Sequence, residues 1–165
     1  MPHTFDKSKL PSRYVSVGPE RAPQRSYYYA MGMTEEEIAR PFVAVVSAGN
    51  DSAPCNTTLD FQANICRDGV VQGGGTITVT AGIAMGHQGM KSSLVSREVI
   101  ADSVELSMRG HCYDAIVGFA GCDKSLPGMM MAMLRLNVPS IFVYGGSILP
   151  GRYEGRDLTV QDVFE

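Results

Sequence analysis

The sequence AIVGFAGCDKSLPGMMMAMLRLNVPSIFVYGG, residues 115–146, contains two short apolar runs with a helical segment between them. The runs at 115–120 and 140–144 are rich in β-branched and aromatic residues and almost continuously apolar, as in strands covered on both faces. The segment at 129–136 is apolar nearly all round, which predicts a buried helix. We therefore expect a strand–helix–strand unit here.

The same alternation occurs earlier in the chain. Apolar runs at 42–47 and 76–80 predict two more strands, and residues 59–68 and 98–109 predict helices. One stripe of the second helix should contain Val99, Ser103, Val104 and Met108. Strands that alternate with helices predict an α/β fold, with a parallel, doubly wound sheet flanked by helices.

The N-terminal region has a different character. Residues 1–33 are rich in Pro, Arg, Ser and Tyr without a helical or strand period, so we expect an extended arm that lies over the rest or over a partner subunit. MTEEEIARP then predicts a short helix, with Thr34 as its N-cap and Pro41 ending it. This division gives an arm at 1–33 and an α/β domain at 34–165.

Composition limits the function classes. The net charge of −3 argues against nucleic acid or an anionic membrane as the main partner. No apolar stretch approaches the roughly 18 residues of a membrane span, and the first residues do not resemble a signal peptide, so we expect a cytoplasmic location. The four cysteines form no C-x-x-C pair, and a disulfide framework is not expected.

An unusual turn follows each predicted strand. The four turns are AGNDSAPCN at 48–56, AGIAMGHQGM at 81–90, GCDKSLPG at 121–128 and GGSILPG at 145–151. In open parallel α/β sheets, ligands bind beyond the carboxyl ends of the strands. These four turns should therefore line one crevice.

The third turn carries the most chemistry, because a thiol, a carboxylate and an amine follow one another at Cys122, Asp123 and Lys124. Ser125 and Pro127 mark the start of the next helix, whose N-terminus favours anions, including a thiolate. Thiolates suit iron–sulfur clusters and carboxylates suit Mg²⁺, so the turn suggests a cluster beside a magnesium site. The alternative is a buried cysteine followed by an Asp–Lys pair on the surface.

The remaining candidates are less specific. Cys55, after Pro54, is either a ligand or a buried structural residue. We interpret Cys66 and Cys112 as structural, and His87 as a hydrogen-bonded loop residue rather than a metal ligand.

Two long segments and one short motif resemble the dihydroxy-acid dehydratase family, which is grouped with the phosphogluconate and sugar-acid dehydratases. They are the sequence at 121–146, AGIAMGHQGMKSSLVSREVIADSVE at 81–105, and APCN at 53–56. The resemblance extends from about Leu10 to the end of the chain. It implies the N-terminal domain of a two-domain hydro-lyase that is usually a homodimer.

The resemblance also implies a set of ligands. The family builds an iron–sulfur cluster, [2Fe–2S] favoured here over [4Fe–4S], on three cysteines, of which Cys55 and Cys122 match two. Asp123 matches a Mg²⁺ ligand, and Lys124 matches a lysine that carbamylation converts into a further ligand. In the implied reaction, cluster iron acts on the leaving 3-hydroxyl while Mg²⁺ holds the carboxylate and the 2-hydroxyl. A base removes the C2 proton, and the enol becomes a 2-oxo acid.

The implied substrate is 2,3-dihydroxy-3-methylbutanoate, in branched-chain amino-acid biosynthesis. Two features depart from the family. Ala81 stands where an Asp ligand of Mg²⁺ is usual, and the stretch before the second predicted strand is several residues shorter than in relatives. We expect weaker Mg²⁺ binding, or an extra water in place of the lost carboxylate.

The third cysteine, a Glu ligand of Mg²⁺ and the serine thought to act as base would all follow Glu165. We therefore expect the chain to be inactive without the remainder of the dehydratase chain. Two alternatives stay open: a sugar-acid or phosphogluconate dehydratase, and a truncated relative that keeps the fold without catalysis.

Overall fold

The computed structural model describes residues 5–70, 76–78 and 93–165. It contains a four-stranded sheet in which every neighbouring pair is parallel. The spatial order is β2 (Thr76–Thr78), β1 (Val43–Ser47), β3 (Ala115–Ala120) and β4 (Ser140–Tyr144). The predicted parallel α/β sheet is confirmed; the run predicted at 76–80 is a strand over its first three residues, and its last two lie outside the described part.

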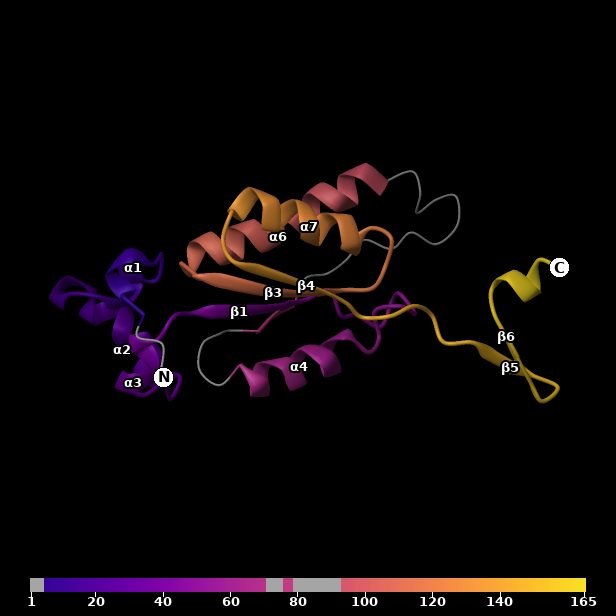
Figure 1. Ribbon diagram of the computed structural model, residues 1–165, viewed down its shortest axis with the longest axis horizontal. Helices are drawn as coiled ribbons and strands as arrows, with labels where there is room; N and C mark the ends of the chain where they lie inside the picture. Colours follow the sequence, from indigo (N-terminus) through magenta and orange to yellow (C-terminus); the bar gives the residue numbers. More distant parts are fainter. Residues whose placement is uncertain (1–4, 71–75, 79–92) are drawn as a thin grey trace.

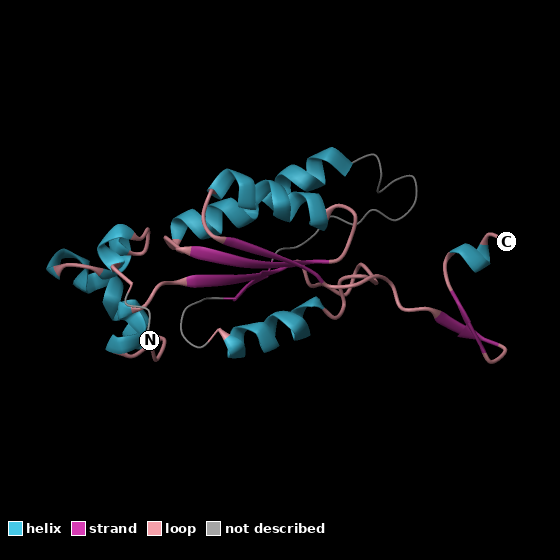
Figure 2. Cartoon of the chain, viewed as in Figure 1, coloured by secondary structure: helices cyan, strands magenta, loops and turns pink. Residues whose placement is uncertain are grey.

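Helices cover both faces of the sheet (Figure 1). Helix α4 (Leu59–Gly69) lies on one face, and α6 (Ser93–Gly110) and α7 (Ser125–Leu136) lie on the other (Figure 2). The chain passes from β1 outward to β2 and then returns across β1 to β3. The winding therefore reverses between β1 and β3, which defines a topological switch point at their carboxyl ends.

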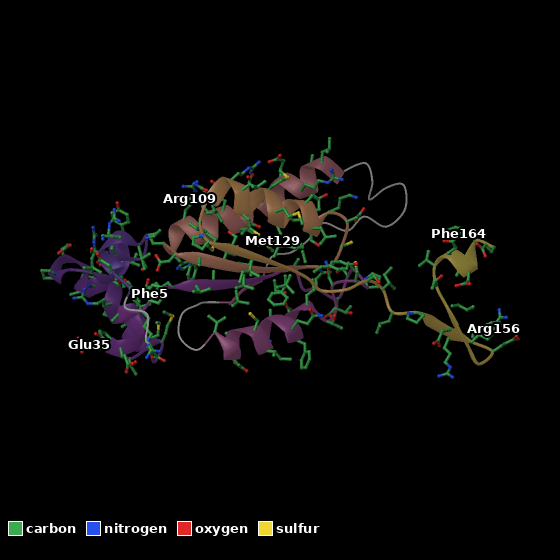
Figure 3. All side chains as sticks on the ribbon, in the orientation of Figure 1. Phe5, Glu35, Arg109, Met129, Arg156 and Phe164 are labelled. Atoms are coloured by element: carbon green, nitrogen blue, oxygen red, sulfur yellow. The ribbon has the colours of Figure 1, made fainter. Side chains whose placement is uncertain are left out.

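The core lies between the sheet and its helices, with Met129 of α7 completely buried there (Figure 3). Helices α6 and α7 approach closely at Gly128, where an added Cβ would lie 2.8 Å from the Cβ of Ile100. From α6, the residues fully or almost fully buried are Ile100, Ala101, Val104 and Met108. Val104 and Met108 therefore lie on the predicted stripe, but Val99 is 57% exposed and Ile100 takes the inward position.

Two predictions of burial are wrong. Helix α7 was expected to be buried on all sides, yet Leu134 is 82% exposed, because only one side of the helix contacts α6 and the sheet. Strand β4 was expected to be covered on both faces, but it is an edge strand on which Ile141 and Tyr144 are exposed. Apolar composition does not reveal which elements lie at the edge of a domain.

The N-terminal residues are helical rather than extended, so this part of the prediction is wrong. Two short α-helices, α1 (Arg13–Ser16) and α2 (Ala22–Ala30), follow the 3-10 turn η1 (Lys7–Lys9) and flank a second turn, η2 (Pro19–Arg21). The helix predicted after them is confirmed as α3 (Glu35–Ala39), where Thr34 and Glu37 form a capping box. These elements lie together at one end of the sheet (Figure 1).

Buried polar contacts hold the N-terminal helices against the amino ends of β1 and β3. The Asp114 carboxylate accepts hydrogen bonds from Ser12 N (2.7 Å), Ser12 Oγ (2.6 Å) and Phe42 N (2.7 Å). Lys7 donates to the carbonyl oxygens of Ile38 and Arg40, and its Nζ lies 3.7 Å from the centroid of the Phe42 ring. We call Lys7, Ser12, Phe42 and Asp114 the amino-edge cluster.

The C-terminal residues form a small hairpin that projects away from the sheet (Figure 1). Strands β5 (Gly151–Tyr153) and β6 (Arg156–Leu158) pair antiparallel and are followed by the turn η3 (Gln161–Val163). Glu154 and Gly155 both have positive φ, as a two-residue type I′ turn requires. Among the described helices, none combines the length and the apolar character needed to cross a bilayer.

Candidate metal centre

The loops that follow β1 and β3 meet at the switch point. The contact is so close that a Cβ added at Gly121 would lie 2.2 Å from the carbonyl oxygen of Cys55. The same Cβ would lie 3.2 Å from Oδ1 of Asn56. Only glycine allows this approach without a shift of the backbone. Two segments more than 60 residues apart are thereby held against each other, as the turn pattern predicted.

The first loop is organised by Asn50. Its Nδ2 donates to Ala48 O (2.9 Å), and its Oδ1 accepts from the backbone N–H groups of Ser52 and Ala53, both at 3.0 Å. Asn56 N then bonds to Ala53 O at 2.9 Å and closes the turn that contains Cys55. Short polar side chains that bond to nearby backbone commonly fix turns in this way.

The second loop leads directly into α7. Ser125 Oγ accepts from Cys122 N (3.0 Å) and donates to Cys122 O (3.1 Å), while Leu126 N also bonds to Cys122 O (2.9 Å). Cys122 is thus held at the start of the helix, and α7 begins at Ser125 as predicted.

The thiols of Cys55 and Cys122 lie within hydrogen-bonding reach of each other. Burial raises the pKa of Cys122 to about 11, and the neighbouring Cys55 thiol adds to the rise. In the metal-free protein, burial and the Cys55 thiol thus act against the thiolate that the helix N-terminus was expected to favour. A metal that binds here must displace protons, because cysteine ligates as the thiolate.

Asp123 and Lys124 form an ion pair in which the two side chains differ greatly in their exposure to solvent. The Lys124 side chain is 1% exposed and that of Asp123 is 55% exposed. Burial acts to raise the pKa of Asp123, but the hydrogen bond from Lys124, with help from Cys122 and Arg97, leaves that pKa below its usual value. Because the amine is buried, the alternative of an Asp–Lys pair on the surface does not describe this lysine.

Two residues at this site had no role assigned from the sequence, although Asn56 belongs to the unusual turn after the first predicted strand. Asn56 is completely buried, and neither its Oδ1 nor its Nδ2 has a hydrogen-bond partner within residues 5–70, 76–78 and 93–165. Leaving such a group unsatisfied costs about 1–3 kcal/mol. Arg97 of α6 contributes positive charge near Asp123, and its Nε likewise lacks a partner in these ranges. Both residues lie in the quoted motifs, but no spacing rule singles them out.

The fourth turn, at 145–151, begins beside the end of β3 and the helix α4. Gly145 N bonds to Ala120 O at 3.0 Å, and Gln62 Nε2 of α4 donates to Gly145 O at 3.0 Å. The next residues run into the hairpin, where an apolar hollow is lined by Ile148, Leu149 and Val160 among others and by neither cysteine of the site. The second turn, with Ala81 and His87, lies outside the described residues.

The donor set fits part of an iron–sulfur site. Cys55 and Cys122 supply two adjacent soft ligands, and Asp123 Oδ1 lies 3.5 Å from Cys122 Sγ. In the described part of the chain, no group of three or more His, Cys, Asp or Glu side chains is arranged to hold a metal ion. Any cluster bound here would therefore require a ligand from elsewhere.

The other two cysteines do not join this pair. Cys66 of α4 packs against the hydrophobic core. Cys112 precedes β3, and burial followed by the charge of Asp114 raises the pKa of its thiol. All four cysteines of the chain are free thiols.

Comparison with known proteins identifies the family. Residues 40–165 match the family described as dihydroxy-acid/6-phosphogluconate dehydratase, N-terminal. The chain is 71% identical to a dihydroxy-acid dehydratase of Parvibaculum lavamentivorans and 71% identical to one of Dinoroseobacter shibae, each over 98% of this chain and 29% of the relative. It is 72% identical to dihydroxy-acid dehydratase 2 of Mesorhizobium japonicum, over 98% of this chain and 28% of that protein. It thus spans less than a third of these relatives, and it belongs to the dihydroxy-acid/6-phosphogluconate dehydratase family as an N-terminal portion.

Proposed function

We propose that this chain supplies the cluster- and magnesium-binding part of a hydro-lyase that dehydrates dihydroxy acids. The observation that carries the proposal is the meeting of Cys55 and Cys122 at the switch point, next to the Asp123–Lys124 pair. The relatives named dihydroxy-acid dehydratase, at about 70% identity, support the reaction class.

Cys55 and Cys122 would hold the cluster, for which we favour [2Fe–2S], and the third ligand would come from the remainder of the dehydratase chain. When bound, such a cluster supplies a Lewis acid for the leaving hydroxyl. The protein contributes the geometry: the close approach at Gly121 keeps the two sulfurs together before any metal arrives. Because the chain's cysteines are free thiols, a reducing compartment such as the cytoplasm suits the site.

Asp123 would bind Mg²⁺ through its half-exposed carboxylate, which the low pKa keeps ionised at neutral pH. Lys124 would become a further oxygen ligand by carbamylation: its ammonium group first loses one proton to solvent, the neutral amine then adds CO₂, and the carbamic acid formed loses a second proton to give the carbamate. The buried lysine has the Asp123 carboxylate as an ion-pair partner, and a carbamate at that position would face the same cation. With Ala81 in place of the usual Asp, we expect Ala81→Asp to tighten Mg²⁺ binding.

The proposed reaction removes the C3 hydroxyl and the C2 proton of the substrate as water. The enol that remains then becomes a 2-oxo acid by moving one proton to carbon. We propose 2,3-dihydroxy-3-methylbutanoate as the substrate, and we place the base, like the third thiolate, in the remainder of the chain. We also propose that the complete protein works as a homodimer.

The test uses a fusion chain, in which residues 1–165 are joined to the part of the Parvibaculum lavamentivorans relative that lies beyond the match. Because the matched part of this relative is 71% identical to the chain, we expect residues 1–165 to pack against the added part as the relative's own N-terminal part does. After anaerobic reconstitution, the fusion chain should form a visible cluster and convert 2,3-dihydroxy-3-methylbutanoate to the 2-oxo acid. Residues 1–165 alone should do neither efficiently.

Matched cysteine variants sharpen the test. Cys55→Ser or Cys122→Ser in the fusion chain should abolish cluster formation, while Cys112→Ser should leave it intact. Faster turnover of gluconate or 6-phosphogluconate than of the branched dihydroxy acid would reject the proposed substrate. A fusion chain that folds, binds no iron and shows no turnover would reject the proposed function and favour a non-catalytic relative.

A further inference from the structure

Asn56 has a fully satisfied backbone and an unsatisfied side chain. Its N–H donates to Ala53 O (2.9 Å) and its carbonyl accepts from Leu59 N (3.1 Å). Its carboxamide is 0% exposed, yet no hydrogen bond reaches it from the parts of the chain that the structure describes. Buried polar atoms without partners are rare in native folds, so each one requires an explanation, and a bound group that supplies the missing partner is one.

The loop does not need Asn56 for its own shape. Asn50 already supplies the three side-chain hydrogen bonds that fix the turn. Asn56 instead lies between the two cysteine loops, because it follows Cys55 directly and its Oδ1 lies beside Gly121, the residue before Cys122. A group bound by both thiols would therefore lie next to this carboxamide.

We propose that Asn56 is a positioning residue for the iron–sulfur cluster, with its Nδ2–H donating a hydrogen bond to a cluster sulfur. This inference rests on the proposed function, since it requires a cluster on Cys55 and Cys122. Hydrogen bonds to the sulfurs stabilise the more negative, reduced form and raise the reduction potential. Partners of this kind also help to retain the metal.

Two variants separate the donor from the shape of the side chain. Asn56→Leu removes both polar atoms and keeps a side chain of comparable length. Asn56→Asp keeps the shape but replaces the donor with a carboxylate that repels the cluster's negative charge. Thr57→Val is the matched control, because Thr57 is exposed on the same turn and, among the described residues, its hydroxyl makes only a long hydrogen bond to Pro54 O, at 3.3 Å.

The experiment uses the fusion chain after anaerobic reconstitution. The midpoint potential is measured by redox titration of the visible or EPR signal, and cluster retention by the rate of iron release to a chelator. Asn56→Leu should lower the potential and release iron about tenfold faster than the parent. Asn56→Asp should lower the potential further, and Thr57→Val should match the parent in both measurements.

A third measurement separates this role from a structural one. In the metal-free fusion chain, Asn56→Leu should keep or raise the melting temperature, because it removes an unsatisfied buried amide. If Asn56→Leu lowers that temperature and leaves the potential unchanged, the amide is structural and the inference is overturned. A parent that binds a cluster whose potential and retention are the same in all variants overturns this inference alone. A parent that binds no cluster overturns the proposed function as well.

Discussion

The two ends of the sheet bury polar groups in opposite ways. At the amino end, Asp114 accepts three hydrogen bonds and Lys7 donates two, so the charged groups there are paired within the protein. At the carboxyl end, Asn56 has no partner among the described residues and Cys122 is a protonated thiol next to another. The first arrangement stabilises the fold by itself, whereas at the second, apart from the Lys124–Asp123 pair, we propose that these groups acquire their partners when a ligand binds.

The largest expected effect breaks the amino-edge cluster. Asp114→Ala removes three charge-assisted acceptor contacts and leaves Ser12 N and Phe42 N buried without a partner. We expect a loss of about 4 kcal/mol in the free energy of unfolding, measured by urea denaturation. Asp68→Ala, which removes only an exposed ion pair at 3.4 Å, should change it by less than about 1 kcal/mol. Equal effects of the two substitutions would contradict the structural role of Asp114.

A second substitution separates the two cysteine loops. Gly121→Ala places a methyl group 2.2 Å from the Cys55 carbonyl oxygen, so one loop must move. We expect a loss of about 3 kcal/mol in unfolding free energy, together with loss of cluster formation in the fusion chain. Gly110→Ala is the control, because nothing lies within 4 Å of the added methyl group. If Gly121→Ala forms a normal cluster, close contact of these loops is not needed for the site.

The pH dependence of stability tests the buried amine of the amino-edge cluster. Burial lowers the pKa of Lys7 from 10.5 to about 8, against the opposing effect of Asp114. Between these values the unfolded chain binds the proton more tightly, so the free energy of unfolding should rise as pH increases from 8 to 10.5. Relative to Lys7→Met, we expect a gain of about 2 kcal/mol. A difference that stays flat over this range would show that Lys7 is not desolvated.

The smallest expected effect is on the rate at which the Cys122 thiol is alkylated, and not on the free energy of unfolding. Since burial and the Cys55 thiol raise the pKa of Cys122 to about 11, little thiolate is present at pH 8. Alkylation of Cys122 by iodoacetamide, followed by mass spectrometry, should be roughly tenfold or more slower in the folded chain than in urea. The rate should increase up to about pH 11. A rate that levels off below pH 9 would mean that the carboxyl end already holds a thiolate.

The strands of the sheet could be predicted because each is specified by the apolar residues of its own segment. The runs before Cys122 and after Pro139 are strands β3 and β4 with the predicted bounds, and Thr34 caps its helix. The N-terminal helices were not predictable in this way, because α1 and α2 are short and lack an apolar period. The start of α1 is held by the hydrogen bonds of Ser12 to Asp114, which lies about 100 residues away in the sequence, and Tyr28 of α2 packs edge-on against the Phe42 ring.

The types of residue at the candidate site could be predicted from the sequence, but their burial, hydrogen bonding and protonation could not. Loops at the carboxyl ends of parallel strands converge by topology, so Cys55 and the turn at 122–124 could be placed together from the sequence. The roles of Asp123 and Lys124 as metal ligands remain predictions. No specific role could be assigned to Asn56 or Arg97 from the sequence, because their significance lies in missing hydrogen-bond partners and not in spacing.

The sequence by itself determined where the four strands of the sheet and the helices that cover it form, the parallel winding of the sheet and the kinds of side chain at the switch point. Only the tertiary structure decided which of those groups are buried, which are paired and which hold a proton. The physical reason is that hydrogen-bond satisfaction and the pKa of a thiol depend on neighbours in space, such as Gly121 beside Asn56 or Cys55 beside Cys122. Periodicity encodes which face of an element is apolar, but not what packs against it.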